Sequence, residues 1–182
     1  QVYFLDNDTF FKRKAMFDNP KTGEFYEDNA DRLAFYNKGV LETVMNLGWQ
    51  PDIIHCHDWP AGLIPLLVRS KYKGEEIFKN TKIVYNLHHP ENKGIFDSTR
   101  ILDLLGLPEK TDINSLLHNG KVDMLRIGLQ YSDFVVTGNH LSNEFDELFS
   151  ELDINPTKIQ GSPEDVSNKF SDYYREITDS DE

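Results

Sequence analysis

The stretch Pro51–Pro60, PDIIHCHDWP, decides the fold. Its first half, Asp52–Cys56, has the composition of a short buried strand, and its second half places His57, Asp58 and Trp59 in the turn that follows. In an open parallel α/β sheet, ligands bind in the crevice beyond the carboxyl ends of the strands. Core packing explains the two isoleucines, but not an imidazole, a carboxylate and an indole in succession. The stretch is therefore predicted to be both a strand of the sheet and a candidate functional site.

Strands and helices alternate on both sides of this stretch. Before it, the apolar residues of Asn29–Leu47 recur every three or four positions, which predicts a helix that Asp28 would cap and Gly48 would end. After it, the pattern predicts helices at Ala61–Ser70, Leu102–Leu105, from Asn114 and at Asp123–Tyr131, and strands at Ile83–Leu87 and Asp133–Thr137. Short apolar strands separated by helices predict an α/β fold with a Rossmann-like, doubly wound parallel sheet.

The two ends of the chain carry separate predictions. Val2–Leu5 has the composition of a strand that nothing precedes, so the Rossmann-like domain, residues 1–160, is expected to be truncated at its start. Ser162–Asp165 shows the pattern of a helix N-terminus, a hydroxyl followed by proline and two acids. Residues 161–182 are expected to form a helix whose apolar stripe packs back onto the sheet, followed by an acidic tail.

Length, charge and cysteine usage exclude several classes of protein. The 182 residues favour a single domain over two small ones. A formal charge of −12 and a pI near 4.9 argue against nucleic acid and anionic membranes as partners, since both would be repelled. Cys56 is the only cysteine, so no disulfide can form within the chain, and no run approaches the roughly 18 apolar residues of a membrane span. We therefore expect a soluble, cytoplasmic protein.

A metal site is one interpretation of the histidines near the strand ends. His55, His57 and Asp58, with His88 and His89 after the next strand, offer imidazole and carboxylate ligands that suit zinc or iron. However, neither an H-E-x-x-H helix nor a second Asp-His pair accompanies them. Isolated histidines at strand ends are more often structural, and that interpretation is favoured for His55 and His89. A metal-dependent hydrolase is thus the weakest of the functional hypotheses.

Asp58 and His88 are the leading candidates for a shared role. Each takes the first loop position after a predicted strand, where neighbouring strand ends can converge on one ligand. Asp58 could equally cap the helix that follows it. For Trp59, core packing is favoured, although an indole at the rim of a site also offers a flat face to a sugar ring. Since the sequence contains no glycine-rich phosphate loop, the main cradle of any nucleotide would lie elsewhere.

Five segments carry a resemblance in a fixed order. They are VYFLDN at Val2–Asn7, DNADRLAFY at Asp28–Tyr36, WQPDIIHCHDWPAGL at Trp49–Leu63, VYNLHHPENKG at Val84–Gly94, and the predicted helix and strand within Leu125–Thr137. Together, over roughly residues 1 to 138, they resemble the N-terminal catalytic domain of bacterial glycogen synthases and plant starch synthases, glycosyltransferase family 5. The third segment is the most specific. The chain is also similar to short single-domain glycogen synthase-like proteins of Bacteroidetes, which stop near this point.

The resemblance implies the N-terminal half of a GT-B fold, in which two Rossmann-like domains face each other and the other domain holds most of the donor. It implies transfer of glucose from ADP-glucose to an α-1,4-glucan with retention of configuration, and with neither a metal nor another cofactor. By the same resemblance, Asp58 would orient substrate hydroxyls and His88 would hydrogen-bond the transferring glucose. The further substrate-binding residues would be His57, Trp59, His89 and Gly94.

The chain also departs from that family. His89 replaces an asparagine, Pro90–Lys93 differ from the expected L-A-Y-Q, and Gly138–His140 stand where V-S-P is expected. The family's K-x-G-G-L loop and its second domain are missing from the sequence, so a separate domain or chain would have to bind the donor, and the fragment alone is expected to be inactive. The alternative hypothesis is a glucan-binding or regulatory module that kept the fold without turnover.

Overall fold

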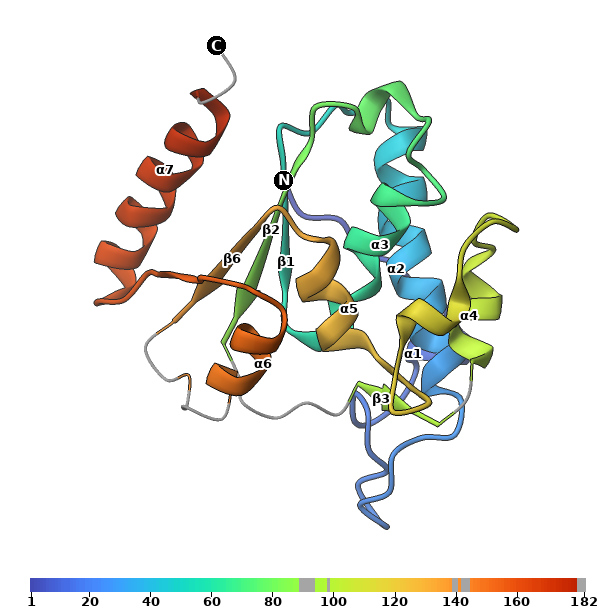
Figure 1. The fold of residues 1–182 in the computed structure, drawn as a ribbon. Helices are drawn as coiled ribbons and strands as arrows, with labels where there is room; N and C mark the ends of the chain where they lie inside the picture. The colour runs from blue at the N-terminus through green and yellow to red at the C-terminus, as the bar shows by residue number, and fades with distance from the viewer. Residues whose placement is uncertain (89–93, 98, 139–140, 142–144, 180–182) are drawn as a thin grey trace.

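A four-stranded parallel sheet organises the computed structural model, which describes residues 1–88, 94–97, 99–138, 141 and 145–179. The strand order is β1-β2-β6-β7, and every neighbouring pair is parallel (Figure 1). The strands are β1 Ile53–His57, β2 Lys82–Leu87, β6 Phe134–Thr137 and β7 Thr157–Lys158. A small antiparallel sheet has the order β3-β5-β4, formed by Ile95–Phe96, Lys121–Asp123 and Leu117–His118.

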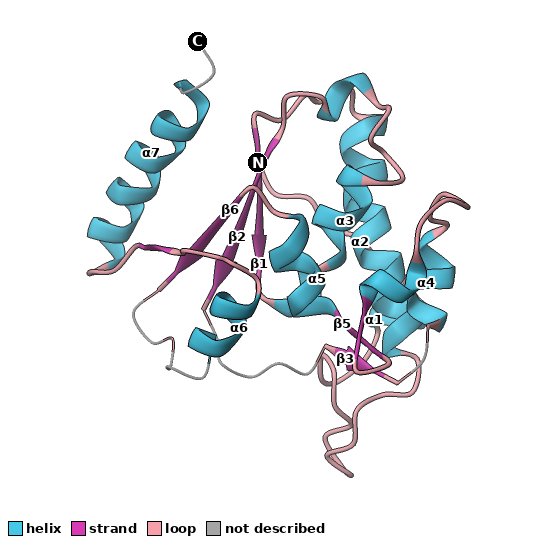
Figure 2. Cartoon of the chain, in the orientation of Figure 1, coloured by secondary structure: helices cyan, strands magenta, loops and turns pink. Residues whose placement is uncertain are grey.

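Helices lie on both faces of the parallel sheet (Figures 1 and 2). One face is covered by α2 Asn29–Asn46, α3 Leu63–Arg69 and α5 Met124–Tyr131, and α6 Asp146–Glu151 adds Phe149 to the same core. The other face is covered by α7, Pro163–Asp179. The short helices are α1 Asp8–Phe11 and α4 Arg100–Leu105, and 3₁₀ turns occur at Trp59–Ala61, Glu76–Phe78 and Ile113–Leu116. This arrangement confirms the predicted doubly wound α/β fold.

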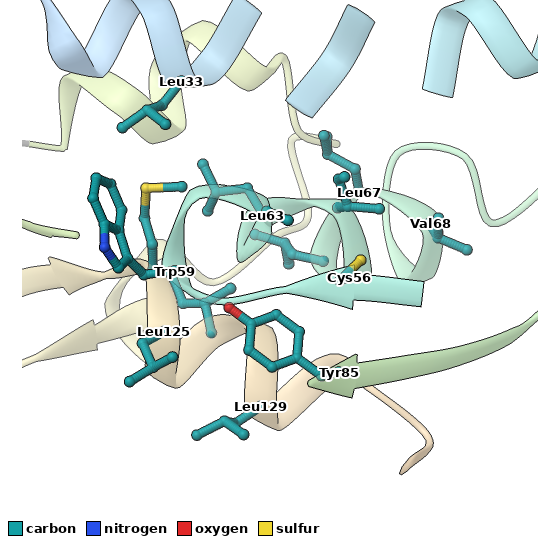
Figure 3. Close-up of a cluster of buried hydrophobic side chains, with 14 of the residues drawn as sticks. Leu33, Cys56, Trp59, Leu63, Leu67, Val68, Tyr85, Leu125 and Leu129 are labelled. Carbon is teal, nitrogen blue, oxygen red and sulfur yellow. The ribbon is translucent and has the colours of Figure 1, made fainter. Parts of the chain in front are cut away.

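The alternation of strand side chains divides the core in two. Successive strand residues point to opposite faces of a sheet, so paired residues such as Cys56 and Tyr85 lie on the same face. Both are buried with the leucines of α3 and α5 (Figure 3). The opposite face carries a smaller cluster under α7, in which Val84, Val136 and Ile177 are buried. Side chains of α7 thus pack against this face of the sheet.

Two glycines let the elements on the larger face approach closely. A Cβ atom at Gly62, just before α3, would lie 2.0 Å from the carbonyl oxygen of Met124. A Cβ atom at Gly128, within α5, would lie 2.4 Å from the Tyr85 ring. Real Cβ atoms do not approach other atoms this closely, so both contacts require glycine. The α5 helix is thereby held against α3 on one side and β2 on the other.

Helix ends follow the sequence signals with one exception. The Asp165 N–H donates to Ser162 Oγ at 3.2 Å, and the Ser162 N–H donates to Asp165 Oδ2 at 3.1 Å, which caps α7 as predicted. Gly48, with φ +65°, follows the end of α2. Asp28 stands at the predicted N-cap position, but its side chain makes no capping hydrogen bond there. It accepts from Arg13 Nη1 at 2.8 Å instead, because a guanidinium is the stronger partner for a carboxylate.

The strand predicted at Val2–Leu5 is wrong, since this segment is irregular. The Tyr3 ring packs edge-on against Trp49 with centroids 4.9 Å apart, and Leu5 lies against Gly39 of α2. Apolar composition gave the strand signal, but a strand also needs a neighbour that shares its backbone hydrogen bonds. Tyr3 and Leu5 instead contact Trp49 and α2, while Val2 and Phe4 are exposed. None of the described helices is both long and apolar enough to cross a bilayer.

Candidate functional site

The carboxyl ends of β1 and β2 bring Asp58 and His88 together. The two strands are paired in parallel with His57 opposite Asn86, so the residues that follow them emerge at the same edge of the sheet. The backbone N–H of His88 donates to Asp58 Oδ1 at 2.8 Å. The two strand ends thus bring the Asp58 carboxylate into contact with the backbone of His88. The catalytic roles of these two residues remain predictions.

The turn at Asp58 is strained and is held by its neighbours. Asp58 has φ +52° and ψ −177°, a combination that residues with a side chain rarely adopt. Its N–H donates to the Asn86 carbonyl at 3.0 Å, and its own carbonyl accepts from the Tyr85 hydroxyl at 2.7 Å. The carboxylate makes no capping hydrogen bond to the following 3₁₀ turn. The capping alternative is thus not what the structure shows, because the carboxylate faces the β2 loop.

Three imidazoles form a row beside this turn. His57 Nδ1 lies 2.8 Å from His88 Nε2, and the two rings are inclined by 15°. The His55 ring stacks on His57 with centroids 4.2 Å apart. At the inner end of the row, His55 Nδ1 is hydrogen-bonded to the hydroxyl of Tyr174 in α7. The row runs from beneath α7 to the exposed side chain of His88.

Burial keeps the inner part of this row uncharged. Desolvation, with smaller effects from His57 and His88, lowers the pKa of His55 to about 3. Desolvation and the neighbouring His88 also lower the pKa of His57, against an opposing effect of Asp58. Because two ring nitrogens face each other at 2.8 Å, one must donate and the other accept. The His57–His88 pair can therefore hold one shared proton and offer the remaining nitrogen of His88 to a ligand.

The other predicted binding residues are placed differently. Trp59 is 6% exposed, and its ring lies 4.5 Å from that of Phe17. Gly94 is buried against the same indole, where a Cβ atom would lie 2.8 Å from the ring. This environment matches the core-packing alternative for Trp59. His57 lies at the site, and His89 falls outside the described residues. The assignment of these four residues to substrate binding remains a prediction.

Cys56 and the proposed metal ligands offer little reactive chemistry. Cys56 is 2% exposed, and burial raises the pKa of its thiol to about 12. It is thus a structural thiol, as expected from its place in the strand. Within residues 1–88, 94–97, 99–138, 141 and 145–179, no three His, Cys, Asp or Glu side chains are arranged to hold a metal ion. The described part of the chain gives the metal-site interpretation no support.

A cavity adjoins the site along the same edge of the sheet. It has a volume of about 420 Å³ and lies beyond the carboxyl ends of β6 and β7, where Thr137, Gly138, Lys158 and Gln160 line it. The Gly138 N–H donates to the Leu87 carbonyl at 3.3 Å, one residue before His88. The cavity therefore lies at the edge of the sheet where ligands of parallel sheets bind, although neither Asp58 nor His88 lines it.

Two residues of the site were not found from the sequence. The sequence pattern indicates only that Tyr85 belongs to a buried strand and Tyr174 to an apolar helical stripe. Their hydroxyl groups nevertheless hold the Asp58 carbonyl and the His55 ring. The alternation of β2 places Tyr85 on the face covered by α3 and α5, but no sequence signal shows what a buried hydroxyl will meet. The partner of Tyr174 depends on where α7 docks.

Comparisons with known proteins agree with this geometry. A family model described as the starch synthase catalytic domain matches residues 1–143. The glycogen synthase of Pelodictyon phaeoclathratiforme is 42% identical over 139 residues, which cover 75% of this chain and 28% of that protein. The glycogen synthase of Chlorobaculum tepidum is 40% identical over 137 residues, with the same coverage of both chains.

A solved structure shows the same fold. The catalytic domain of starch synthase IV from Arabidopsis thaliana, bound to ADP and acarbose, matches with a TM-score of 0.59 at 20% identity, over 77% of this chain and 31% of that chain. The chain spans about 28% of the length of the glycogen synthases that it matches. Because the family model covers most of its residues, this chain belongs to the starch synthase catalytic domain family, glycosyltransferase family 5.

Proposed function

We propose that this chain forms the acceptor-side part of a glycogen or starch synthase-type glucosyltransferase. The reaction would transfer glucose from ADP-glucose to an α-1,4-glucan with retention of configuration. The convergence of Asp58 and His88 at adjacent strand ends carries this proposal, together with membership of the family. The relatives named glycogen synthase and the Arabidopsis structure bound to ADP and acarbose support the donor and the type of acceptor.

His88 would act as the hydrogen-bond donor to the transferring glucose. If His57 donates its Nδ1–H to His88 Nε2, the neutral His88 carries its proton on Nδ1. That N–H would then be available to a hydroxyl of the transferring glucose. Asp58 would act in two ways in this scheme, by orienting substrate hydroxyls and by fixing the backbone that carries His88.

The binding site for the donor would be completed by a part of the protein outside this chain. The chain spans about 28% of the length of the glycogen synthases that it matches, and its sequence contains no glycine-rich phosphate loop. We propose that a separate domain or chain holds most of the ADP-glucose, while the edge of the parallel sheet faces the glucan. The proposed transfer uses no metal and no cofactor, and takes place in the cytoplasm.

Transfer of labelled glucose from ADP-glucose to maltooligosaccharides by the purified full-length protein tests this function. His88→Ala is expected to lower the rate at least about 100-fold, since a lost hydrogen bond to developing charge has this size. The matched control is His118→Ala, in the β4–β5 hairpin, which should keep full activity. Binding of maltooligosaccharide without any transfer by the wild type would instead support the non-catalytic module. A large fall in melting temperature of His88→Ala would show a structural role.

A further inference from the structure

The helix α7 contacts the candidate site through His55. His55 and His57 are two residues apart on β1, so both rings lie on the face that α7 covers. On this face, Tyr174 is hydrogen-bonded to His55 Nδ1, and the Phe170 ring lies 5.1 Å from the imidazole. All of α7 lies outside residues 1–143, the part that matches the family. Membership of the family therefore does not account for this contact.

The contact is transmitted to His88 by stacked rings. The planes of His55 and His57 are inclined by 29° with centroids 4.2 Å apart, so a rotation of the inner ring displaces the outer one. His57 is in turn hydrogen-bonded to His88 at 2.8 Å. A hydrogen bond of this length tolerates little displacement, because its energy falls steeply with distance and angle. The orientation of His88 thus depends on the orientation of His55.

The Tyr174 hydroxyl determines that orientation. His55 Nε2 is buried and has no hydrogen-bond partner among the described residues. The Nδ1 atom therefore makes the hydrogen bond that selects the tautomer and the ring angle. Phe170 and His57 confine the His55 ring by packing, but a packed ring can still flip, which exchanges the positions of its two edges. Without the hydroxyl, the imidazole would lose the interaction that distinguishes one orientation from the other.

We propose that Tyr174 is a positioning residue of the candidate site. Its hydroxyl fixes His55, the His55 ring fixes His57, and His57 holds His88 in the orientation and tautomer that face the ligand. The proposal rests on the proposed function only in assigning His88 to the glucose. The tautomers of the three histidines are observable in the protein without any substrate, so the positioning can be judged separately from the transfer.

The first test compares Tyr174→Phe with the matched control Tyr173→Phe. The control removes a hydroxyl from the same helix, at a ring that packs against Phe134 rather than the histidines. Imidazole nitrogen spectra of ¹⁵N-labelled protein are expected to show altered His57 and His88 tautomer signals in Tyr174→Phe and unchanged signals in Tyr173→Phe. Transfer by Tyr174→Phe should show a kcat lowered roughly 3- to 30-fold, the usual size of remote effects, with the KM for glucan unchanged.

A second variant breaks the same hydrogen bond from the other side. His55→Phe keeps a ring on His57 but removes the hydrogen-bond partner of Tyr174. The kcat of the double variant, with Tyr174→Phe and His55→Phe together, should be no lower than that of either single variant. Unchanged His57 and His88 signals in both single variants would overturn the proposal, whatever the transfer rates. If the wild type shows no transfer while the signals shift as expected, the proposed function fails and the positioning stands.

Discussion

Asp58 combines the side chain of a candidate site residue with an unfavourable backbone conformation. Non-glycine residues in this region of φ and ψ cost about 1–3 kcal/mol and persist only where neighbouring contacts hold them. Here the Tyr85 hydroxyl and the Asn86 carbonyl hold the backbone of Asp58, and its carboxylate holds His88. A glycine would suit the turn better, but it could not supply the carboxylate. The aspartate thus provides the contact with His88 at a cost in backbone conformation.

Substitution of Asp58 should separate these two effects. Asp58→Gly is expected to be at least as stable as the wild type, because glycine adopts φ +52° without strain. Asp58→Ala should be less stable than Asp58→Gly by about 1 kcal/mol, since alanine keeps the strain. Both variants should lose glucosyl transfer. Urea denaturation measures the stability difference, and an alanine variant as stable as the glycine variant would show that the turn relaxes without strain.

His55 should make the stability of the protein depend on pH. Its folded-state pKa is lowered to about 3 by burial, whereas the unfolded chain binds the proton near pH 6.5. The unfolded state thus gains protons first on acidification, and the stabilisation present above pH 6.5 is lost as the pH falls toward 3. Between pH 7.5 and pH 5, His55 should contribute a loss of about 1–2 kcal/mol in the free energy of unfolding.

The comparison of His55→Gln with His118→Gln isolates this contribution. Glutamine at position 55 does not titrate, so His55→Gln should show a shallower fall of the free energy of unfolding between pH 7.5 and pH 5. His118 lies in the β4–β5 hairpin, away from the histidine row, and its substitution serves as the control. Equal pH dependence of the wild type and His55→Gln would mean that His55 takes up its proton at the same pH in the folded and the unfolded protein.

At the scale of the elements, close approach decides how α3, α5 and β2 fit together. Glycine within a helix such as α5 costs about 1 kcal/mol relative to alanine, so propensity alone disfavours Gly128. The contact with Tyr85 outweighs propensity, because a Cβ atom would lie 2.4 Å from a fully buried ring. Tyr85 cannot move away without releasing the Asp58 carbonyl. The packing of α5 and the geometry of the site are therefore coupled.

Alanine substitutions should measure this packing. Gly128→Ala is expected to lower the free energy of unfolding by about 1–3 kcal/mol, the cost of overpacking a core, despite its better helix propensity. Gly62→Ala should cost at least as much, since it meets the backbone of Met124 rather than a side chain. Gly74→Ala is the control, because nothing lies within 4 Å of its Cβ position. A stabilised Gly128→Ala would show that Tyr85 can shift freely.

At the scale of the whole molecule, α7 closes the second face of the sheet. The cluster beneath it is small. Ile177 is the buried residue that α7 adds to this cluster, and it is 4% exposed. Val84 and Val136 of the same cluster belong to the central strands β2 and β6, which also carry the larger core on their other face. The helix is therefore expected to unfold together with the sheet rather than as an independent unit.

Ile177→Ala tests this cooperation. The substitution should lower the free energy of global unfolding by about 2 kcal/mol, a common cost of removing a buried aliphatic side chain. Trp59 lies in the opposite core, so its fluorescence in a Trp49→Phe background reports on the far side of the sheet. Arg175→Ala, at an exposed position of α7, is the control and should leave the midpoint of the Trp59 unfolding transition unchanged. If Ile177→Ala leaves the Trp59 transition in place, α7 unfolds separately.

Much of the architecture was accessible from the sequence because it depends on local pattern. The period of the apolar residues located α2, α3 and α5 and the strands β1, β2 and β6 to within a few residues. The short elements β3, β4, β5 and β7 were not predicted, because two or three residues are too few for a periodic signal. The false strand at Val2–Leu5 has the same origin, since composition does not report whether a pairing partner exists.

The site was accessible in part for a similar reason. In a parallel sheet, adjacent strands end at the same edge, so the order of β1 and β2 alone predicted that Asp58 and His88 would meet. The same reasoning could not show that the carboxylate would bind the β2 backbone rather than cap a helix. The competing hydrogen bonds are similar in energy, and packing selects among them.

The sequence by itself determined the strands β1, β2 and β6, the helices α2, α3 and α5, and the edge at which the candidate groups lie, because hydrophobic periodicity and the alternation of strands and helices can be read along the chain. The tertiary structure alone decided that Tyr85 holds the strained turn and that Tyr174 holds the histidine row. These contacts join residues 27 and 119 positions apart. They depend on the docking of whole elements, and a linear pattern carries no record of which side chains docking brings together.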